Sequence, residues 1–191
     1  MKTIVCDFDD VICYNKMVDI VNKFLHSDYK MEDFIEGYDP SSFVHDPKKM
    51  RALQKYILKK NIYKNATLID GAYDTLKKLQ EEYGYEIYIC SACMLIGHED
   101  ISGPIFKQKY DYILKYLPFI KPQNIIFTSA KDMVYGDVMI DDRLINLNGK
   151  FKTKILFETC YTKKLKKTEL EKQGINKVSN WKQIEKLLIK K

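Results

Sequence analysis

Short apolar segments recur along this chain and alternate with segments of helical periodicity. Each apolar run is bounded by polar residues and is rich in Ile, Val, Tyr or Phe. Continuous apolar runs of this length are typical of parallel strands that are covered on both faces of a sheet. We therefore expect strands at residues 3–8, 86–90, 124–128, 137–140 and 153–157.

Three segments that follow such runs carry apolar residues at the three- and four-residue spacing of an amphipathic helix. Gly103-Pro104 marks the start of the second of these helices, because proline is favoured in a first helical turn. Strands that alternate with helices predict an α/β fold with a doubly wound parallel sheet. The three apolar stripes are Ala72, Leu76, Leu79 and Tyr83; Phe106, Tyr110, Ile113 and Leu117; and Trp181, Ile184, Leu187 and Leu188.

One long segment after the first strand interrupts this alternation, because it contains helical stripes and no good strand. A first stripe runs from Met17 to Leu25, and Asp46-Pro47 begins a second helix. We expect a small helical cap inserted after the first strand, on the C-terminal edge of the sheet. The predicted division is an α/β core at 1–14 and 71–191 with the cap at 15–70.

Composition places the chain among globular proteins, since 46% of its 191 residues are hydrophobic and 30% are charged. No apolar run approaches the roughly 18 residues that span a bilayer, and Lys2 leads directly into a strand pattern rather than a signal peptide. Five cysteines without an export signal indicate reduced thiols. We therefore expect a cytoplasmic protein without a membrane partner.

The net charge of +6 comes almost entirely from lysine, because Arg51 and Arg143 are the only arginines among 32 basic residues. Arginine is the residue favoured for bidentate phosphate and base contacts. Lysine runs such as 163–167 are more often a solvated face. We expect no nucleic-acid partner.

Two of the expected strands end in paired carboxylates. Asp7-Phe8-Asp9-Asp10-Val11 ends the first strand, and Asp141-Asp142 follows residues 137–140. In open α/β sheets, ligands bind outside the carboxyl ends of the strands. Carboxylates gathered at that edge would repel one another, whereas Mg²⁺ prefers such oxygen ligands. An isolated Asp-rich turn would be an equally good interpretation of the first motif alone.

A hydroxyl and an ammonium accompany the carboxylates. Ser91 ends the strand at 86–90, and Lys131 lies ten residues before Asp141. These are the groups that a phosphoryl group needs opposite its metal. Taken singly, Ser91 is as well explained as a helix N-cap and Lys131 as a surface charge.

The order of these motifs resembles the haloacid dehalogenase (HAD) superfamily of phosphohydrolases, whose core is Rossmann-like. The resemblance extends from Asp7 to Asp142 and includes all four motifs. Residues 128–131, 135–143 and 69–72, and the cap, resemble more narrowly the 5′(3′)-deoxyribonucleotidase (cytosolic type C 5′-nucleotidase) branch. The implied function is a Mg²⁺-dependent phosphomonoesterase that hydrolyses (deoxy)nucleoside monophosphates through an aspartyl-phosphate intermediate.

The resemblance also implies roles for individual residues. Asp7 would attack phosphorus, and Asp9 would act as acid and base while its backbone carbonyl contacts Mg²⁺. The metal ligands would be Asp7, Asp9 and Asp142, with Asp141 as a supporting or alternative ligand. The implied phosphate-binding residues are Ser91, Ala92 and Lys131.

The chain departs from the nucleotidase pattern at three positions. Asn15 replaces a base-stacking Phe, which leaves the adjacent Tyr14 as the expected base contact. Ala92 replaces a second hydroxyl after Ser91, and Ser129 replaces an Arg. Phosphate chemistry is therefore better supported than nucleotide preference.

Three alternative functions stay open. A phosphatase of another small metabolite, such as a sugar phosphate, would use the same residues. A signalling receiver domain also combines Asp, Mg²⁺, a hydroxyl and Lys, but its acidic pair comes first and its Lys last. An inactive binding module would have no use for Asp9. The Cys90-Ser-Ala-Cys93 motif lacks a second pair for zinc, so Cys90 is better explained as strand core.

Overall fold

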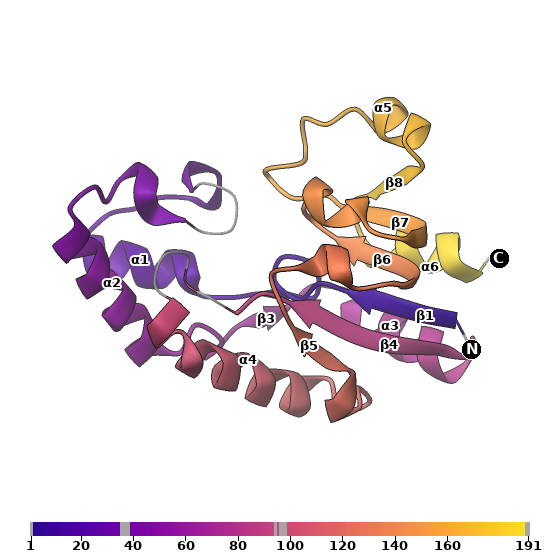
Figure 1. Ribbon diagram of the computed structural model, residues 1–191, viewed down its shortest axis with the longest axis horizontal. Helices are drawn as coiled ribbons and strands as arrows, with labels where there is room; N and C mark the ends of the chain where they lie inside the picture. The colour runs from indigo at the N-terminus through magenta and orange to yellow at the C-terminus, as the bar shows by residue number, and fades with distance from the viewer. Residues whose placement is uncertain (1, 35–38, 94, 96–98, 190–191) are drawn as a thin grey trace.

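A computed structural model describes residues 2–34, 39–93, 95 and 99–189 of the chain (Figure 1). Within them, six strands form one sheet in the order β5-β4-β1-β6-β7-β8, and every neighbouring pair is parallel. The predicted doubly wound α/β fold is thereby confirmed. The strands are β1 (Lys2–Cys6), β4 (Tyr85–Ser91), β5 (Ile125–Phe127), β6 (Gly136–Asp141), β7 (Phe151–Phe157) and β8 (Ile175–Val178), of which β8 was not predicted.

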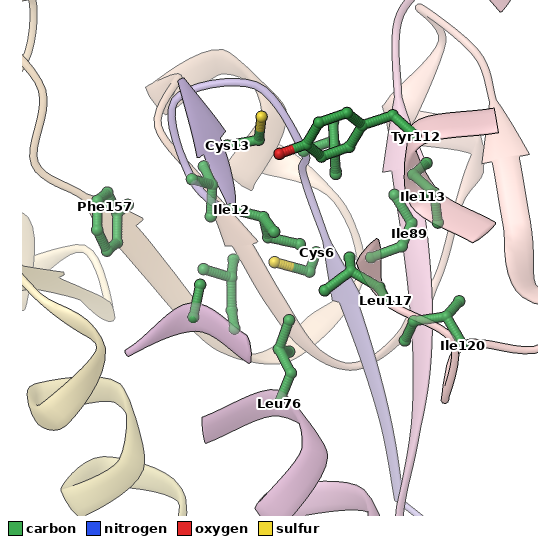
Figure 2. Close-up of a cluster of buried hydrophobic side chains, with 14 of the residues drawn as sticks. Cys6, Ile12, Cys13, Leu76, Ile89, Tyr112, Ile113, Leu117, Ile120 and Phe157 are labelled. Carbon is green, nitrogen blue, oxygen red and sulfur yellow. The ribbon is translucent and has the colours of Figure 1, made fainter. Parts of the chain in front are cut away.

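Apolar side chains cover both faces of the sheet. On one face, Cys6 and Ile89 of the strands meet Leu76 of α3 (Ala72–Glu81) and Ile113 of α4 (Gly103–Tyr116) (Figure 2). Trp181 of α6 (Trp181–Ile189) belongs to the same cluster. The opposite face, which includes Val5, Cys90 and Met139, packs under the 3-10 helix Leu144–Asn148 and α5 (Lys167–Lys172). Continuous apolar strands therefore mark a sheet that is buried on both sides.

The apolar faces of α3 and α4 differ from the predicted stripes. Tyr83 follows the end of α3 and is exposed, and Tyr110 is 36% exposed. In α4, Ile113 and the C-cap residue Leu117 are buried as predicted, but the other buried positions are Ile105, Lys109 and Tyr112, each one position before a predicted residue. One residue turns a helix by about 100°, so the shift exchanges Tyr110 for Lys109 at the core.

The segment between β1 and α3 forms two longer helices, α1 (Met17–Leu25) and α2 (Pro47–Lys60). The Asp46 carboxylate caps α2 by accepting a hydrogen bond of 2.9 Å from the Lys48 backbone N–H, as its sequence predicted. Both helices lie beside the carboxyl ends of the strands (Figure 1). Two short strands, β2 (Cys13–Tyr14) and β3 (Thr67–Leu68), pair antiparallel where the chain enters and leaves this segment.

Strand β1 lies at the point where the sheet reverses its order. The chain continues from β1 to β4 and β5 on one side and returns to β6 on the other. Cys6 pairs with Ile89 of β4 and with Ile140 of β6. This register places the ends of all three strands at one edge, where α/β proteins bind ligands. No helix among the described residues is long and apolar enough to cross a membrane.

Candidate active site

A cavity of about 610 Å³ opens between the strand ends and the helical segment 15–70. Its lining includes all the residues that were predicted to bind phosphate or to react, namely Asp7, Asp9, Ser91, Ala92, Lys131 and Asp142. Away from the strand ends the wall is mixed: it has the apolar side chains of Met17, Met50, Ile57, Ile62, Leu95 and Ile105 and the polar residues Asn15, Asp39, Ser41, Gln54 and Glu99. The cavity is therefore acidic and basic at the sheet edge and partly apolar toward α1 and α2.

Asp7 follows β1 directly, and its backbone N–H donates to the Ile140 carbonyl at 2.9 Å. Only 7% of the Asp7 residue is exposed, yet it lines the cavity. Oδ1 accepts a hydrogen bond of 2.7 Å from the Phe8 N–H and lies 2.9 Å from the Lys131 ammonium. No described residue donates to Oδ2. One oxygen is thus anchored, and the other is left for a ligand.

Asp141 lies behind the cavity wall and is fully buried. Its Oδ2 accepts from Lys131 at 2.7 Å, and its Oδ1 accepts from the Arg143 N–H and the Asn146 amide, both at 2.9 Å. Burial, followed by the nearby Asp7 charge, raises the pKa of Asp141 to about 6. Both oxygens of this carboxylate are therefore occupied, and one of them holds Lys131 beside Asp7.

Asp142 differs from its neighbour because no described residue donates a hydrogen bond to its carboxylate, although only 6% of the residue is exposed. Burial and then the charge of Asp7 raise its pKa well above the usual range. Oxygen atoms of Asp7, Asp141 and Asp142 lie within 4.8 Å of one another. This donor set fits a hard cation such as Mg²⁺, which would compensate the crowded negative charge.

Asp9 lies in a tight loop in which the N–H groups of Ile12 and Cys13 both donate to the Phe8 carbonyl. Its Oδ1 accepts from the Asn15 amide at 2.8 Å and from the Tyr63 hydroxyl at 2.9 Å. Its Oδ2 accepts from Lys109 at 2.7 Å and from Tyr63 at 3.1 Å. The side chain of Asp9 therefore stands apart from the cluster of Asp7, Asp141 and Asp142 and is oriented by three donors.

Lys109 was missed by the sequence analysis, although it lies at the centre of the site. Its ammonium donates to Asp9, to Ser91 Oγ at 2.6 Å and to the Ala92 carbonyl. Burial is the largest single influence and would lower the pKa of Lys109, but the charge and hydrogen bond of Asp9, together with Cys93 and Asp7, raise the pKa overall, so the group stays an ammonium. The available signal was a lysine four residues from both Ile105 and Ile113, within an apolar stripe.

Besides Asp141, which lies behind the wall, Tyr14 is a predicted site residue that does not line the cavity. It pairs with Thr67 in the short β2-β3 hairpin, and 48% of it is exposed. Adjacent residues in a strand point to opposite sides, and Asn15 is the neighbour that lines the cavity. The predicted contact between Tyr14 and a base therefore has no support in this geometry.

The two cysteines of the CxxC motif have separate surroundings. Cys90 packs in the apolar cluster on one face of the sheet, whereas Cys93 belongs to the other cluster and lines the cavity. Burial raises the pKa of each thiol to about 11. Neither is a thiolate at neutral pH, so the pair has no character of a redox motif.

Comparison with known proteins agrees with this geometry. The family model of the 5′ nucleotidase, deoxy (Pyrimidine), cytosolic type C protein matches residues 1–191. A 5′(3′)-deoxyribonucleotidase of Bacillus subtilis (strain 168) is 29% identical over 129 residues, which cover 68% of this chain and 66% of that protein. A protein of Staphylococcus aureus (strain Mu50), provisionally given the same name, is 25% identical over 190 residues, or 98% and 96% of the two chains.

Solved structures show the same fold at low sequence identity. A HAD hydrolase of family IA, variant 3, from Entamoeba histolytica has a TM-score of 0.56 and 13% identity, covering 96% of this chain and 95% of its own. A haloacid dehalogenase-like hydrolase from Burkholderia xenovorans has a TM-score of 0.55 and 13% identity, covering 98% and 96%. The α/β fold of this chain is therefore one that these two hydrolases share.

Proposed function

Because this chain belongs to the cytosolic type C family of deoxy (pyrimidine) 5′ nucleotidases, and is thus a HAD-type phosphoric monoester hydrolase, we propose that it hydrolyses deoxynucleoside monophosphates through a phosphorylated Asp7. One observation carries this proposal. Asp7 keeps one oxygen without a donor from the described residues and shares a single cavity with Asp9, Ser91, Lys131 and Asp142.

In the first step, Asp7 Oδ2 attacks phosphorus and the bond from phosphorus to the ester oxygen breaks. Asp9, in its protonated form, gives its proton to the leaving alcohol. Ser91 and Lys131 hold the phosphate oxygens, and Asp141 keeps Lys131 in place. A positioned acid contributes typically about 10²–10⁴-fold to such a step.

In the second step, the Asp9 carboxylate takes a proton from water, whose oxygen attacks phosphorus. The bond from phosphorus to Asp7 breaks, which releases inorganic phosphate and restores the Asp7 carboxylate. Splitting one displacement into two in this way is the general benefit of covalent catalysis. The separate anchoring of Asp9 suits a group that must accept and return a proton without binding the metal through its side chain.

Mg²⁺ is the proposed cofactor, and Asp7, Asp142 and the backbone carbonyl of Asp9 are its proposed protein ligands. Asp142 is favoured over Asp141 because its carboxylate has no donor from the described residues, whereas both oxygens of Asp141 are occupied. When bound, the ion neutralises charge on the phosphate and the carboxylates. Asp141 would then act through Lys131 rather than as a ligand.

The proposed domain division follows the cavity. We assign residues 1–14 and 71–191 to the HAD core and residues 15–70 to a cap that closes over the strand ends. Strand β2 ends directly before this cap, and β3 lies close to its last residue, so the β2-β3 pair holds the two ends of the cap together. The cap supplies most of the apolar side chains of the wall, so it would meet the part of the substrate beyond the phosphate.

A substrate panel tests the function directly. We expect kcat/KM for pyrimidine deoxynucleoside monophosphates to exceed that for hexose phosphates at least about tenfold, which corresponds to about 1.4 kcal/mol. The apolar side chains of the wall can bury the flat face of a base, whereas a hexose has no apolar face of similar size to place against them. Phosphate release with Mg²⁺ present is the measurement. Preference for hexose phosphates would reject the nucleotidase part and keep only the phosphatase chemistry.

The variant Asp9→Asn tests whether Asp9 is the acid and base while Asp7 is the nucleophile. We expect this variant to hydrolyse the phosphoenzyme at least about 100-fold more slowly, because an amide cannot take a proton from water. An aryl phosphate whose leaving group needs no proton should then label the protein. Mass spectrometry of the trapped protein should place the phosphate on Asp7. Label on any other residue would contradict the assigned nucleophile.

A further inference from the structure

A buried lysine outside the predicted motifs joins the two halves of the candidate site. Lys109 lies on α4, and only 1% of it is exposed. Its ammonium contacts Asp9 Oδ2, Ser91 Oγ and the Ala92 carbonyl. A lysine ammonium has three N–H donors, and these three acceptors use all of them. Nothing in the roles assigned so far requires this group.

Packing alone does not explain a lysine at this position. Its neighbours on the buried face of α4 are Ile105, Tyr112 and Ile113, and an apolar residue would pack among them without desolvating a charge. The phosphate oxygens already have Lys131 as a cation within the cavity. The function of Lys109 must therefore lie in what its ammonium holds.

The first group that it holds is the Asp9 carboxylate. Without Lys109, Oδ2 would keep a single contact, the 3.1 Å hydrogen bond from Tyr63. Oδ1 would still be held by Asn15 and Tyr63. The carboxylate could then turn about its own axis, and the oxygen that exchanges a proton with water or alcohol would lose its fixed place.

The second group is the Ser91 hydroxyl. Because Lys109 donates to Ser91 Oγ, the hydroxyl hydrogen must point elsewhere. Its nearest protein acceptor is the Ala92 carbonyl at a long 3.5 Å, and that carbonyl already accepts from Lys109. The hydroxyl is thereby left free to donate its hydrogen to a phosphate oxygen in the cavity.

We propose that Lys109 is a positioning residue, whose ammonium fixes the acid–base carboxylate of Asp9 and the phosphate donor Ser91 relative to each other. This inference rests on the proposed function, since it assumes that Asp9 and Ser91 act as assigned. Asp9 and Lys109 are 100 residues apart in sequence, so α4 serves as the rigid support that links the loop after β1 to the end of β4.

The sharpest test compares Lys109→Met with Lys107→Met. Lys107 is on the same helix, its side chain is 77% exposed, and among the described residues it pairs with Asp111 alone, so Lys107→Met is the matched control. The probe is 4-nitrophenyl phosphate, whose leaving group needs no proton. We expect Lys109→Met to raise KM, because Ser91 is no longer held, but to keep a burst of nitrophenolate at saturating substrate. Hydrolysis of the phosphoenzyme should then be at least about tenfold slower, as expected for a misplaced base.

A merely structural role would give a different pattern. It would lower the burst and the steady-state rate of nitrophenolate release by the same factor. That factor would equal the loss of folded protein measured by circular dichroism. That pattern, or kinetics identical to Lys107→Met, would overturn the inference. A wild-type enzyme that forms no phosphoenzyme would instead reject the proposed function itself, so the two failures are distinguishable.

Chemical rescue provides a second variant in case Lys109→Met does not fold. In Lys109→Ala, propylammonium can occupy the space of the missing side chain and restore three N–H donors. We expect it to raise the rate of phosphoenzyme hydrolysis at least about tenfold. Tetramethylammonium has the same charge but no donor and should have no effect. Equal rescue by both ions, or by neither, would contradict a positioning role for the ammonium.

Discussion

Replacing Asp7 by Asn is expected to lower phosphatase activity by at least about 10³-fold, as removal of a catalytic nucleophile typically does. The amide is neutral and cannot form the acyl phosphate, although it can keep the contact with the Phe8 N–H. Phosphate release from the best substrate of the panel is the measurement. The exposed Asp28, whose side chain makes no hydrogen bond or ion pair with a described residue, provides Asp28→Asn as the matched control.

The same substitution should leave the fold intact and at least as stable. Asp7 is a like charge close to two buried carboxylates, and it contributes after burial to the raised pKa of both Asp141 and Asp142. Lys131 would retain its ion pair with Asp141 at 2.7 Å. We therefore expect Tm no lower than that of the wild type. A large fall in Tm would mean that lost activity reflects unfolding rather than loss of the nucleophile.

Removal of the metal is expected to have an effect of similar size. With excess chelator, turnover should fall to background, because Asp7 and Asp142 would then repel the phosphate dianion at close range. Added Mg²⁺ should restore it. Mg²⁺ should also raise Tm of the chelated protein, since a ligand at 100 times its Kd stabilises the folded state by about 2.7 kcal/mol. Full activity in excess chelator would rule out the proposed cofactor.

Two single substitutions separate the adjacent carboxylates in this experiment. Asp142→Asn should require at least about tenfold more Mg²⁺ for half of the thermal shift, which is about 1.4 kcal/mol of lost binding. Asp141→Asn should keep the shift and instead raise KM, because Lys131 loses the partner that holds it. A thermal shift lost only in Asp141→Asn would reverse the assignment of the ligand.

Short-range patterns in the sequence were sufficient for five of the six strands of the sheet and for bringing most of the predicted site residues to one edge. An apolar run that ends in carboxylates or a serine identifies a strand and its reactive end at once, because both features lie within a few residues. Parallel register then brings the ends of β1, β4 and β6 together. Asp7, Ser91, Lys131 and Asp142 could therefore be assigned to one cavity without knowledge of any side-chain contact.

Such patterns could not predict which of Asp141 and Asp142 is the metal ligand. The two residues are identical and adjacent, so their types and spacing contain nothing that distinguishes them. Their different proposed roles rest on Lys131 and Asn146, which donate hydrogen bonds to Asp141, whereas no described residue donates to the carboxylate of Asp142. Tyr14 and Asn15 are a similar pair, because only the direction of the β2-β3 hairpin determines which of them faces the cavity.

Lys109 shows most clearly where periodicity stops being informative. Helix α4 carries two overlapping apolar stripes, and both have helical spacing; one includes Tyr110 and the other includes Lys109. Packing against the sheet selects the second stripe, and the cost of burying its ammonium is met by Asp9 and Ser91, which come from distant parts of the chain. The sequence by itself determines the chemical groups and the strand ends that bring them together. The rotation of α4, which only the tertiary structure decides, places the Lys109 ammonium on Asp9, the proposed acid–base carboxylate.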